Sequence, residues 1–285
     1  MSKIAFQGAK IAFQGESGAN SHMACHEHYP DMEAMPCHSF EDAFAAVHDG
    51  EADLGMIPIE NSVAGRVADI HHLLPESELF IIGERFLRVN HQLLAPKGAS
   101  MDTIKTVRSH VMALGQCRNV IKQYGLRAEI AADTAGAARA VSEAGDPAVA
   151  AIASSLAAEI YGLDTLKTDI EDAVHNTTRF LVMSRDHIIA PANSENVITS
   201  FVFRVRNVPA ALYKVMGGFA TNGVNMTKLE SYQVEGSFNA TQFYADIEGH
   251  PEDPMVKLAL EELQFFSTHL HVLGTYAADS FRENM

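Results

Sequence analysis

The 285-residue sequence is poor in basic residues. Its 21 Lys and Arg are outnumbered by 36 Asp and Glu, which gives a formal net charge of −15. A protein that binds nucleic acid needs clustered Lys and Arg against the phosphates, so this balance argues against that class. An anionic ligand would also need a local basic or dipolar site, because the overall field repels it.

Cysteine pairs and long apolar runs are also missing. Cys25, Cys37 and Cys117 show no C-x-x-C spacing, which is typical of a reducing compartment. No apolar run approaches membrane-spanning length, and residues 1–3 are not followed by the apolar stretch of a signal peptide. We therefore expect a soluble, cytoplasmic protein with neither a membrane nor a nucleic acid as partner.

A group of histidines near the N-terminus raises the question of a metal site. His22 and His26 are spaced to share one helix face, with Cys25 and His28 nearby. No Cys pair or H-E-x-x-H pattern accompanies them, and the second half of a ligand set is missing. We therefore expect no metal site.

Most of the chain alternates short apolar runs with Ala-rich helical stretches, which predicts an α/β fold. We expect two α/β lobes with a cleft between them, one formed by residues 10–88 plus 175–186 and the other by residues 89–174. The six residues at 3–8 recur at 10–15. Only the second copy leads into a polar loop, so we take it as the first strand and expect the first copy to be loosely held.

The composition changes after the predicted lobes. Residues 190–194 are small and polar, which indicates a linker, and we place it at residues 187–196. Residues 197–278 then show the order βαββαβ, with a turn at Glu235-Gly236 between two strands, and this order predicts a ferredoxin-like sandwich.

Three polar segments lie next to predicted strands. Residues 15–21 could bind an anion at a helix start or form an ordinary turn. In residues 58–65, Glu60 could act as an acid or a hydrogen-bond anchor beside Asn61 and Ser62, or the segment could cap a helix. Residues 176–180 could aim side chains into a cleft or form a hydroxyl-rich turn before a strand. The residue types alone leave these alternatives open.

Taken in order, four motifs resemble those of the prephenate dehydratases, and the likeness runs from Lys10 to about Ala277. The motifs are Gly15-Glu16-x-Gly18-x-x-Ser21-His22, Pro58-Ile59-Glu60-Asn61-Ser62-x-x-Gly65, Asp133-Thr134-Ala135-x-Ala137-Ala138 and Asn176-x-Thr178-Arg179-Phe180. The resemblance implies a catalytic domain over residues 10–186, with two lobes like those of type II periplasmic binding proteins.

The resemblance also implies a reaction. Prephenate loses its ring hydroxyl and CO2 to give phenylpyruvate, and aromatisation drives the step, so no cofactor or metal is needed. Thr178 matches the family's catalytic threonine, and we assign it hydrogen-bond donation to the leaving oxygen. Arg179 or the helix end at 15–21 would neutralise substrate carboxylate. Glu60 completes the catalytic set, and the substrate-binding residues are Ser17, Ser21, Asn61, Ser62, Asn176 and Phe180.

The C-terminal part resembles the ACT domain, an amino-acid-sensing module. The family's Gly-Ala-Leu motif corresponds to Pro209-Ala210-Ala211-Leu212, with Ala in place of Gly. Its Glu-Ser-Arg-Pro motif corresponds to Leu229-Glu230-Ser231-Tyr232-Gln233, with Tyr-Gln in place of Arg-Pro. The resemblance implies phenylalanine as effector, bound by residues 209–212 and 229–231, and a homodimer or homotetramer.

Two other functions remain open. Arogenate dehydratase performs the same chemistry on a substrate with an amino acid side arm, and no motif separates the two. A non-catalytic cytoplasmic protein that binds or senses a small molecule would also suit two lobes around a cleft. Turnover of prephenate compared with arogenate would discriminate among the three.

Overall fold

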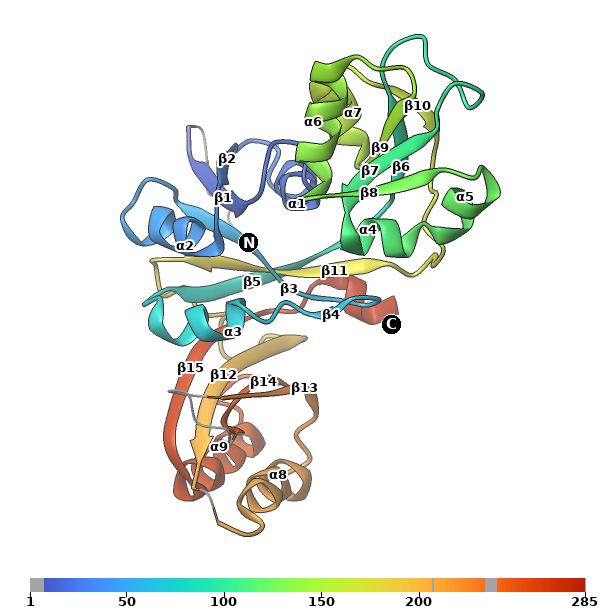
Figure 1. Cartoon of the computed structure of the whole chain (residues 1–285). Helices are drawn as coiled ribbons and strands as arrows, with labels where there is room; N and C mark the ends of the chain where they lie inside the picture. Colours follow the sequence, from blue (N-terminus) through green and yellow to red (C-terminus); the bar gives the residue numbers. More distant parts are fainter. Residues whose placement is uncertain (1–7, 207, 234–239, 285) are drawn as a thin grey trace. The chain divides into compact units, whose positions relative to one another are not determined.

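The computed structural model of the protein describes residues 8–206, 208–233 and 240–284 (Figure 1). The first copy of the repeat, up to Gln7, and the expected turn at 235–236 lie outside these residues. The chain divides into two compact units. One contains Met1–Val67 and Arg85–Phe180, and the other contains Ala68–Glu84 and Leu181–Met285.

The first sheet has the strand order β2-β1-β3-β11-β5, with β4 (Gly65–Arg66) paired to β3. The strands β1 (Lys10–Gln14), β2 (Glu33–Cys37) and β3 (Leu54–Asn61) run parallel. The second copy of the repeat therefore forms a strand, as predicted, and it is the first strand among the described residues. Ile11, Ala12 and Phe13 are fully buried, as expected for a parallel strand covered on both faces. The helices α1 (Asn20–His28) and α2 (Phe40–His48) connect these strands.

The remaining strands of this sheet are β5 (Phe80–Arg88) and β11 (Thr177–Ser184). The boundary between the two units falls within both strands. The first unit contains the end of β5 and the start of β11, and the start of β11 carries the polar segment singled out in the sequence.

The second lobe has its own sheet, in the order β10-β6-β9-β7-β8. Here β7 runs parallel to β8 and β9, whereas β6 runs antiparallel to β9 and β10. Its strands are β6 (Gln92–Ala95), β7 (Thr106–His110), β8 (Arg127–Ala131), β9 (Val149–Ala153) and β10 (Asp164–Lys167). Its helices are α4 (Val111–Gln116), α5 (Arg118–Gln123), α6 (Thr134–Ala144) and α7 (Ser155–Tyr161). The predicted two-lobed α/β fold is thereby confirmed.

Local sequence explains where the helices of the second lobe begin. The carboxylate of Asp133 accepts the backbone N–H of Gly136 at 2.6 Å, and the hydroxyl of Ser154 accepts that of Ala157 at 3.0 Å. Each contact satisfies a backbone donor that the first helical turn leaves free. Both caps fix α6 and α7 beside the N-terminal polar loop described below.

The second unit contains the predicted βαββαβ arrangement. It is formed by β12 (Val197–Val205), α8 (Ala211–Thr221), β13 (Met226–Gln233), β14 (Ala240–Glu248), α9 (Pro254–Phe266) and β15 (Ser267–Ala277). The strands are antiparallel, in the order β13-β14-β12-β15. One face of the sheet packs on the two helices through a core that includes Phe201, Phe203, Phe219 and Leu263. A 3-10 helix, η2 (Ser280–Asn284), follows β15.

A segment far from this sandwich in sequence belongs to the same unit. Residues 68–84 contain α3 (Ile70–Leu73) and η1 (Leu74–Glu76). A Cβ at Gly274 of β15 would lie 1.9 Å from the carbonyl oxygen of Ile81, so only glycine allows this backbone approach. Buried Glu84 also accepts a hydrogen bond from Arg282 Nη2 at 2.9 Å. These contacts explain why the segment groups with the C-terminal part of the chain.

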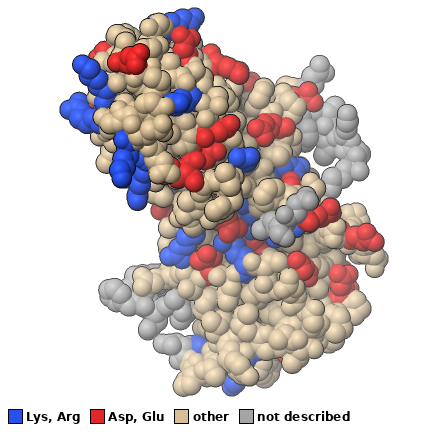
Figure 2. Space-filling model, turned by 90° about the vertical axis from the view of Figure 1, so that its right-hand side faces the viewer, with Lys and Arg blue, Asp and Glu red and all other residues tan. Residues whose placement is uncertain are grey.

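Charged side chains are unevenly distributed over the face of the molecule seen in Figure 2. Figure 2 shows acidic and basic side chains interspersed over the lobe of β6–β10, whereas the visible face of the C-terminal sandwich is largely uncharged. None of the helices in the described ranges has the length and apolarity to cross a membrane.

Candidate functional site: a hydrogen-bonded amide network around Thr178

The polar site forms where β3 ends and β11 begins, because these strands are neighbours in one sheet. Ser62 joins the two segments. Its backbone N–H donates to the carbonyl of Thr177 at 2.9 Å, and its hydroxyl donates to the carbonyl of His175 at 2.6 Å. The Ser62 oxygen also accepts the backbone N–H of Thr177 at 3.0 Å. Ser62 therefore fixes the path of the chain immediately before Thr178.

The side chain of Asn61 lies at the centre of the site. Its Oδ1 accepts the backbone N–H groups of Val63 and Ala64 at 2.9 and 2.8 Å. Its Nδ2 donates to Asn176 Oδ1 at 2.8 Å and to Thr178 Oγ1 at 2.9 Å. Because a backbone N–H can only donate, these two contacts fix which end of the Asn61 amide is oxygen.

The hydroxyl of Thr178 is consequently polarised in one sense. Its oxygen accepts the Asn61 amide hydrogen, so its own hydrogen is not used in that bond. Thr178 is only partly buried, whereas Asn176 beside it is 1% exposed. The arrangement can offer a neutral hydrogen-bond donor to a ligand atom.

Two residues that the sequence analysis missed extend this network. Asn176 Nδ2 donates to Gln116 Oε1 at 3.2 Å, and the same oxygen lies 2.8 Å from His91 Nε2. Gln116 ends α4, and His91 immediately precedes β6. Neither lies in a recognisable motif, and their partners are 25 to 60 residues away in sequence, so only the folded chain reveals them.

Glu60 and Arg179 form an ion pair next to the network. Arg179 Nη1 lies 3.0 Å from Glu60 Oε1, and the side chains are 3% and 33% exposed respectively. A buried guanidinium needs a carboxylate partner because desolvation of an unpaired charge is costly. Phe180, the next residue along β11, has a buried side chain that is 1% exposed.

The N-terminal polar loop contacts the second lobe. Glu16 binds Arg139 of α6 through two hydrogen bonds of 2.8 and 2.7 Å. The hydroxyl of Tyr161 donates to the carbonyl of Ser17 at 2.8 Å, and that of Ser154 donates to the carbonyl of Gly18 at 2.5 Å. The loop is thus held against α6 and α7.

Gly18 is required at the closest point of this contact. Its φ is +90°, and a Cβ there would lie 2.8 Å from the Cα of Ala157. Ser21 begins the buried side of α1. No hydrogen bond among the described residues joins the side chains of Ser17 or Ser21 to Asn61 or Thr178.

The N-terminal histidines and cysteine have ordinary structural partners. His22 Nδ1 accepts the backbone N–H of Gly18 at 3.0 Å, and its ring stacks on Phe13 with centroids 5.1 Å apart. Cys25 is buried at 1% exposure, and burial raises the pKa of its thiol to about 12. These contacts support the interpretation of His22 and Cys25 as packing residues.

The residues expected to bind an effector lie in the second unit. Ala210 precedes α8 with φ +63°, a left-handed conformation that favours glycine. Glu230 Oε1 lies 3.4 Å from Lys228 Nζ on β13, an edge strand. Pro209, Leu229 and Ser231 are exposed, whereas Ala211 and Leu212 pack on the sandwich core.

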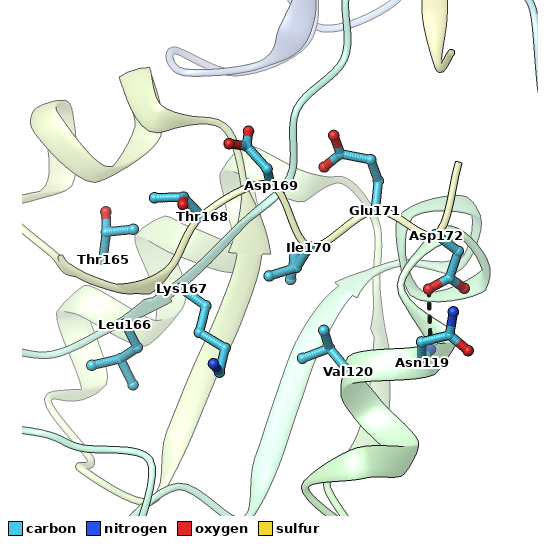
Figure 3. Close-up of a pocket in the computed structure, with 10 residues that line it drawn as sticks. All are labelled: Asn119, Val120, Thr165, Leu166, Lys167, Thr168, Asp169, Ile170, Glu171 and Asp172. Atoms are coloured by element: carbon cyan, nitrogen blue, oxygen red, sulfur yellow. Dashed lines mark hydrogen bonds between the residues drawn. The ribbon is translucent and has the colours of Figure 1, made fainter. Parts of the chain in front are cut away.

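A pocket of about 580 Å³ lies in the second lobe, lined mainly by residues 165–172 (Figure 3). The carboxylate of Asp172 accepts the backbone N–H of Asn119 at 3.1 Å at the start of α5. Glu171, on the same segment, accepts the backbone N–H of His91 at 2.9 Å. One wall of this pocket therefore supports the amide network.

Comparison with known proteins identifies the family. A family model described as prephenate dehydratase matches residues 11–188. A bifunctional N-acyl-homoserine lactone acylase/prephenate dehydratase from Komagataeibacter europaeus is 51% identical over 272 residues, covering 95% of this chain and 97% of that protein.

Two further proteins support the match. A chloroplastic arogenate dehydratase/prephenate dehydratase from Arabidopsis thaliana is 39% identical, covering 95% of this chain and 73% of that protein. The solved structure of prephenate dehydratase from Arthrobacter aurescens in complex with L-Phe has a TM-score of 0.86 and 31% identity, covering 94% of this chain and 90% of that one. The chain therefore belongs to the prephenate dehydratase family, a family of lyases.

Proposed function

We propose that this protein converts prephenate to phenylpyruvate with loss of water and CO2, and that Thr178 assists departure of the ring hydroxyl. The observation that carries this assignment is the bond from Asn61 Nδ2 to Thr178 Oγ1. It leaves the Thr178 hydrogen available to the leaving oxygen. The family match and the order of the four motifs supply the substrate class.

The chemistry requires little of the protein beyond placement and hydrogen bonding. The electrons of the C–C bond to the departing carboxylate enter the ring, the C–O bond breaks, and the hydroxide takes up a proton to leave as water. A threonine hydroxyl is a very weak acid, so Thr178 donates a hydrogen bond as negative charge builds on the oxygen, and solvent supplies the proton. A donor that strengthens its bond as the transition state forms lowers the barrier selectively.

The charged groups of the site suggest which residues orient the catalytic groups and which bind the substrate carboxylate. The guanidinium of Arg179 is buried and bonded to Glu60, so we assign Arg179 to orienting Glu60. The N-terminal end of α1, with Ser17 and Ser21, is then the favoured partner of a substrate carboxylate, because free amides and the helix dipole attract anions. Asn61, Ser62 and Asn176 hold the reacting end, and Phe180 supports the strand beneath it.

The domain assignment follows the same proposal. Residues 10–186 form the catalytic domain, 187–196 a linker and 197–278 an ACT regulatory domain. The enzyme is cytoplasmic and works as a homodimer or homotetramer without a cofactor. The βαββαβ order with strand arrangement β13-β14-β12-β15 supports the ACT assignment.

Phenylalanine is the proposed effector, bound by residues 209–212 and 229–231. The relative from A. aurescens was solved in complex with L-Phe. Tyr232, which replaces the family's arginine, lies with its ring 5.9 Å from that of His71 and 5.6 Å from that of His72. Both histidines belong to residues 68–84, which directly follow the loop that carries Asn61. This continuity offers a route from effector to active site.

A second activity is favoured by one comparison. The K. europaeus relative, 51% identical over nearly the whole chain, is also named an N-acyl-homoserine lactone acylase. Such an enzyme adds water across the amide bond and releases a fatty acid and homoserine lactone. We propose this hydrolysis as the second candidate function. Prephenate rather than arogenate is the preferred dehydratase substrate. The K. europaeus relative is more similar to this chain than the A. thaliana relative, and its name includes prephenate dehydratase but not arogenate dehydratase.

Replacing Thr178 by Val should lower kcat for prephenate by about 10²- to 10³-fold, the range for loss of one preorganised hydrogen-bond donor. Thr178→Ser, which keeps the hydroxyl, should retain most activity. The ultraviolet absorbance of phenylpyruvate in alkali measures both, and parallel assays with arogenate test the substrate preference. A folded Thr178→Val enzyme with wild-type turnover would contradict the assignment.

Phenylalanine should bind the wild-type protein and lower its prephenate turnover. Glu230→Ala should weaken binding and inhibition together, because the effector ammonium loses a carboxylate partner. Lys257→Ala, on the exposed surface of α9, serves as the matched control and should behave as wild type. Isothermal calorimetry without heat at millimolar phenylalanine would remove the effector assignment.

Incubation with a long-chain N-acyl-homoserine lactone should release homoserine lactone, whose free amine can be quantified by derivatisation. If one site performs both reactions, Thr178→Val and wild type will differ in this assay as well. An absence of amine release in a preparation that turns over prephenate would refute the second activity alone.

A further inference from the structure

His91 lies outside every motif that suggested the function, yet it ends the chain of hydrogen bonds that starts at Asn61. Its side chain is 2% exposed, and its only described side-chain hydrogen bond, within residues 8–206, 208–233 and 240–284, goes to Gln116 Oε1 at 2.8 Å. A buried histidine that touches no apparent reacting atom needs an explanation through its partner.

The orientation of the Asn61 amide determines the donor and the acceptor in every hydrogen bond from Asn61 to His91. The backbone N–H groups of Val63 and Ala64 fix the oxygen of Asn61. Asn61 Nδ2 then faces the oxygen of Asn176, so Asn176 presents its nitrogen to Gln116, and Gln116 presents its oxygen. An amide oxygen only accepts, so His91 must carry its proton on Nε2.

The protonation of His91 agrees with this direction. Burial lowers its pKa, although the bond to Gln116 and the charge of Glu171 oppose the shift. The ring is therefore neutral at pH 7 and holds one hydrogen, which the network places on Nε2.

The backbone of His91 is held from both sides. Its N–H donates to Glu171 Oε2 at 2.9 Å, and its carbonyl accepts the N–H of Ile170 at 2.9 Å. The Glu171 side chain is 2% exposed. The adjacent residue Asp172 donates its backbone N–H to the carbonyl of Gln116 at 2.7 Å. Figure 3 shows Glu171 and Asp172 on one continuous segment, which thus positions both His91 and Gln116.

The hydrogen bonds to the side-chain oxygen and backbone carbonyl of Gln116 leave its side-chain Nε2 group available. Its oxygen accepts two hydrogen bonds and is saturated. Within the described residues its Nε2 has no hydrogen-bond partner, and the side chain is only partly buried. The two amide hydrogens of Gln116 therefore remain for a ligand next to Asn176, in addition to the hydrogen of the Thr178 hydroxyl.

We propose that His91 is a positioning residue for the dehydratase reaction, whose Nε2–H locks the Gln116 amide so that its nitrogen faces the substrate. The inference rests on the proposed function, because it concerns the same site. Without His91 the amide could rotate, and a buried oxygen would lose a donor. Misplacement of a substrate contact by about 1 Å can cost on the order of 10²-fold in rate.

Paired substitutions of His91 test the proposal in the full-length protein. His91→Leu should lower kcat/KM for prephenate about 10- to 100-fold, as expected for a displaced contact. His91→Gln places an amide nitrogen near the Nε2 position and should recover most of the loss. His91→Asn, whose nitrogen is too short to reach Gln116, should not. His250→Leu is the matched control, because His250 is also buried and its ring bonds the carbonyl of Ala190 at 3.0 Å and the backbone N–H of Glu252 at 3.1 Å, both in the second unit.

A double-mutant cycle separates positioning from a general structural role. If His91 acts through Gln116, the variant His91→Leu/Gln116→Ala will be no slower than Gln116→Ala alone. Multiplicative losses, equal activity of His91→Leu and wild type, or equal loss in His91→Gln and His91→Leu would each overturn the proposal. If His91→Leu does not fold, the test is the ratio of kcat/KM between His91→Gln and His91→Asn. The proposal expects His91→Gln to be the faster of the two. Absence of wild-type prephenate turnover would instead refute the proposed function.

Discussion

The side-chain amide of Asn61 controls the geometry of the polar site. Two backbone N–H groups fix its oxygen, and its nitrogen donates to both Asn176 and Thr178. This orientation fixes the direction of the other hydrogen bonds in the network. Once one end of a carboxamide is known to accept, its other end must donate to the next residue. A buried polar network contributes fixed geometry when all of its members are satisfied. The Thr178 hydroxyl is thereby held with its hydrogen available.

The two lobes support this network from opposite ends. Asn61 belongs to the first lobe, whereas His91 and Gln116 belong to the second, and Asn176 joins them where the chain crosses back. The contacts of Glu16 with Arg139 and of Gly18 with Ser154 provide a separate junction between the lobes. A relative movement of the lobes would disturb both junctions. The geometry of the polar site therefore depends on contacts from both lobes.

Sequence patterns predicted most of the architecture because periodicity reports on burial. The second copy of the repeat, at residues 10–15, was predicted to form a strand, and the βαββαβ order of residues 197–278 predicted the sandwich. The family resemblance of the motifs placed Asn61 and Thr178 in one site, and they meet because the end of β3 lies beside the start of β11. Gln116 and His91 escaped prediction, since their role depends on contacts between elements distant in sequence. The grouping of residues 68–84 with the C-terminal part depended similarly on the approach of Ile81 to Gly274.

The most direct measurement is the prephenate turnover of Asn61→Asp. Aspartate has nearly the same shape as asparagine, and its carboxylate can still accept the N–H groups of Val63 and Ala64. It cannot donate to Thr178 or Asn176, so each contact can persist only in the reverse direction, with the Thr178 hydroxyl donating to the carboxylate and its hydrogen no longer available to a ligand. The account predicts a folded protein whose kcat falls about 10²-fold or more, as for loss of a preorganised donor. Wild-type kcat in folded Asn61→Asp would show that the amide does not orient the catalytic hydroxyl.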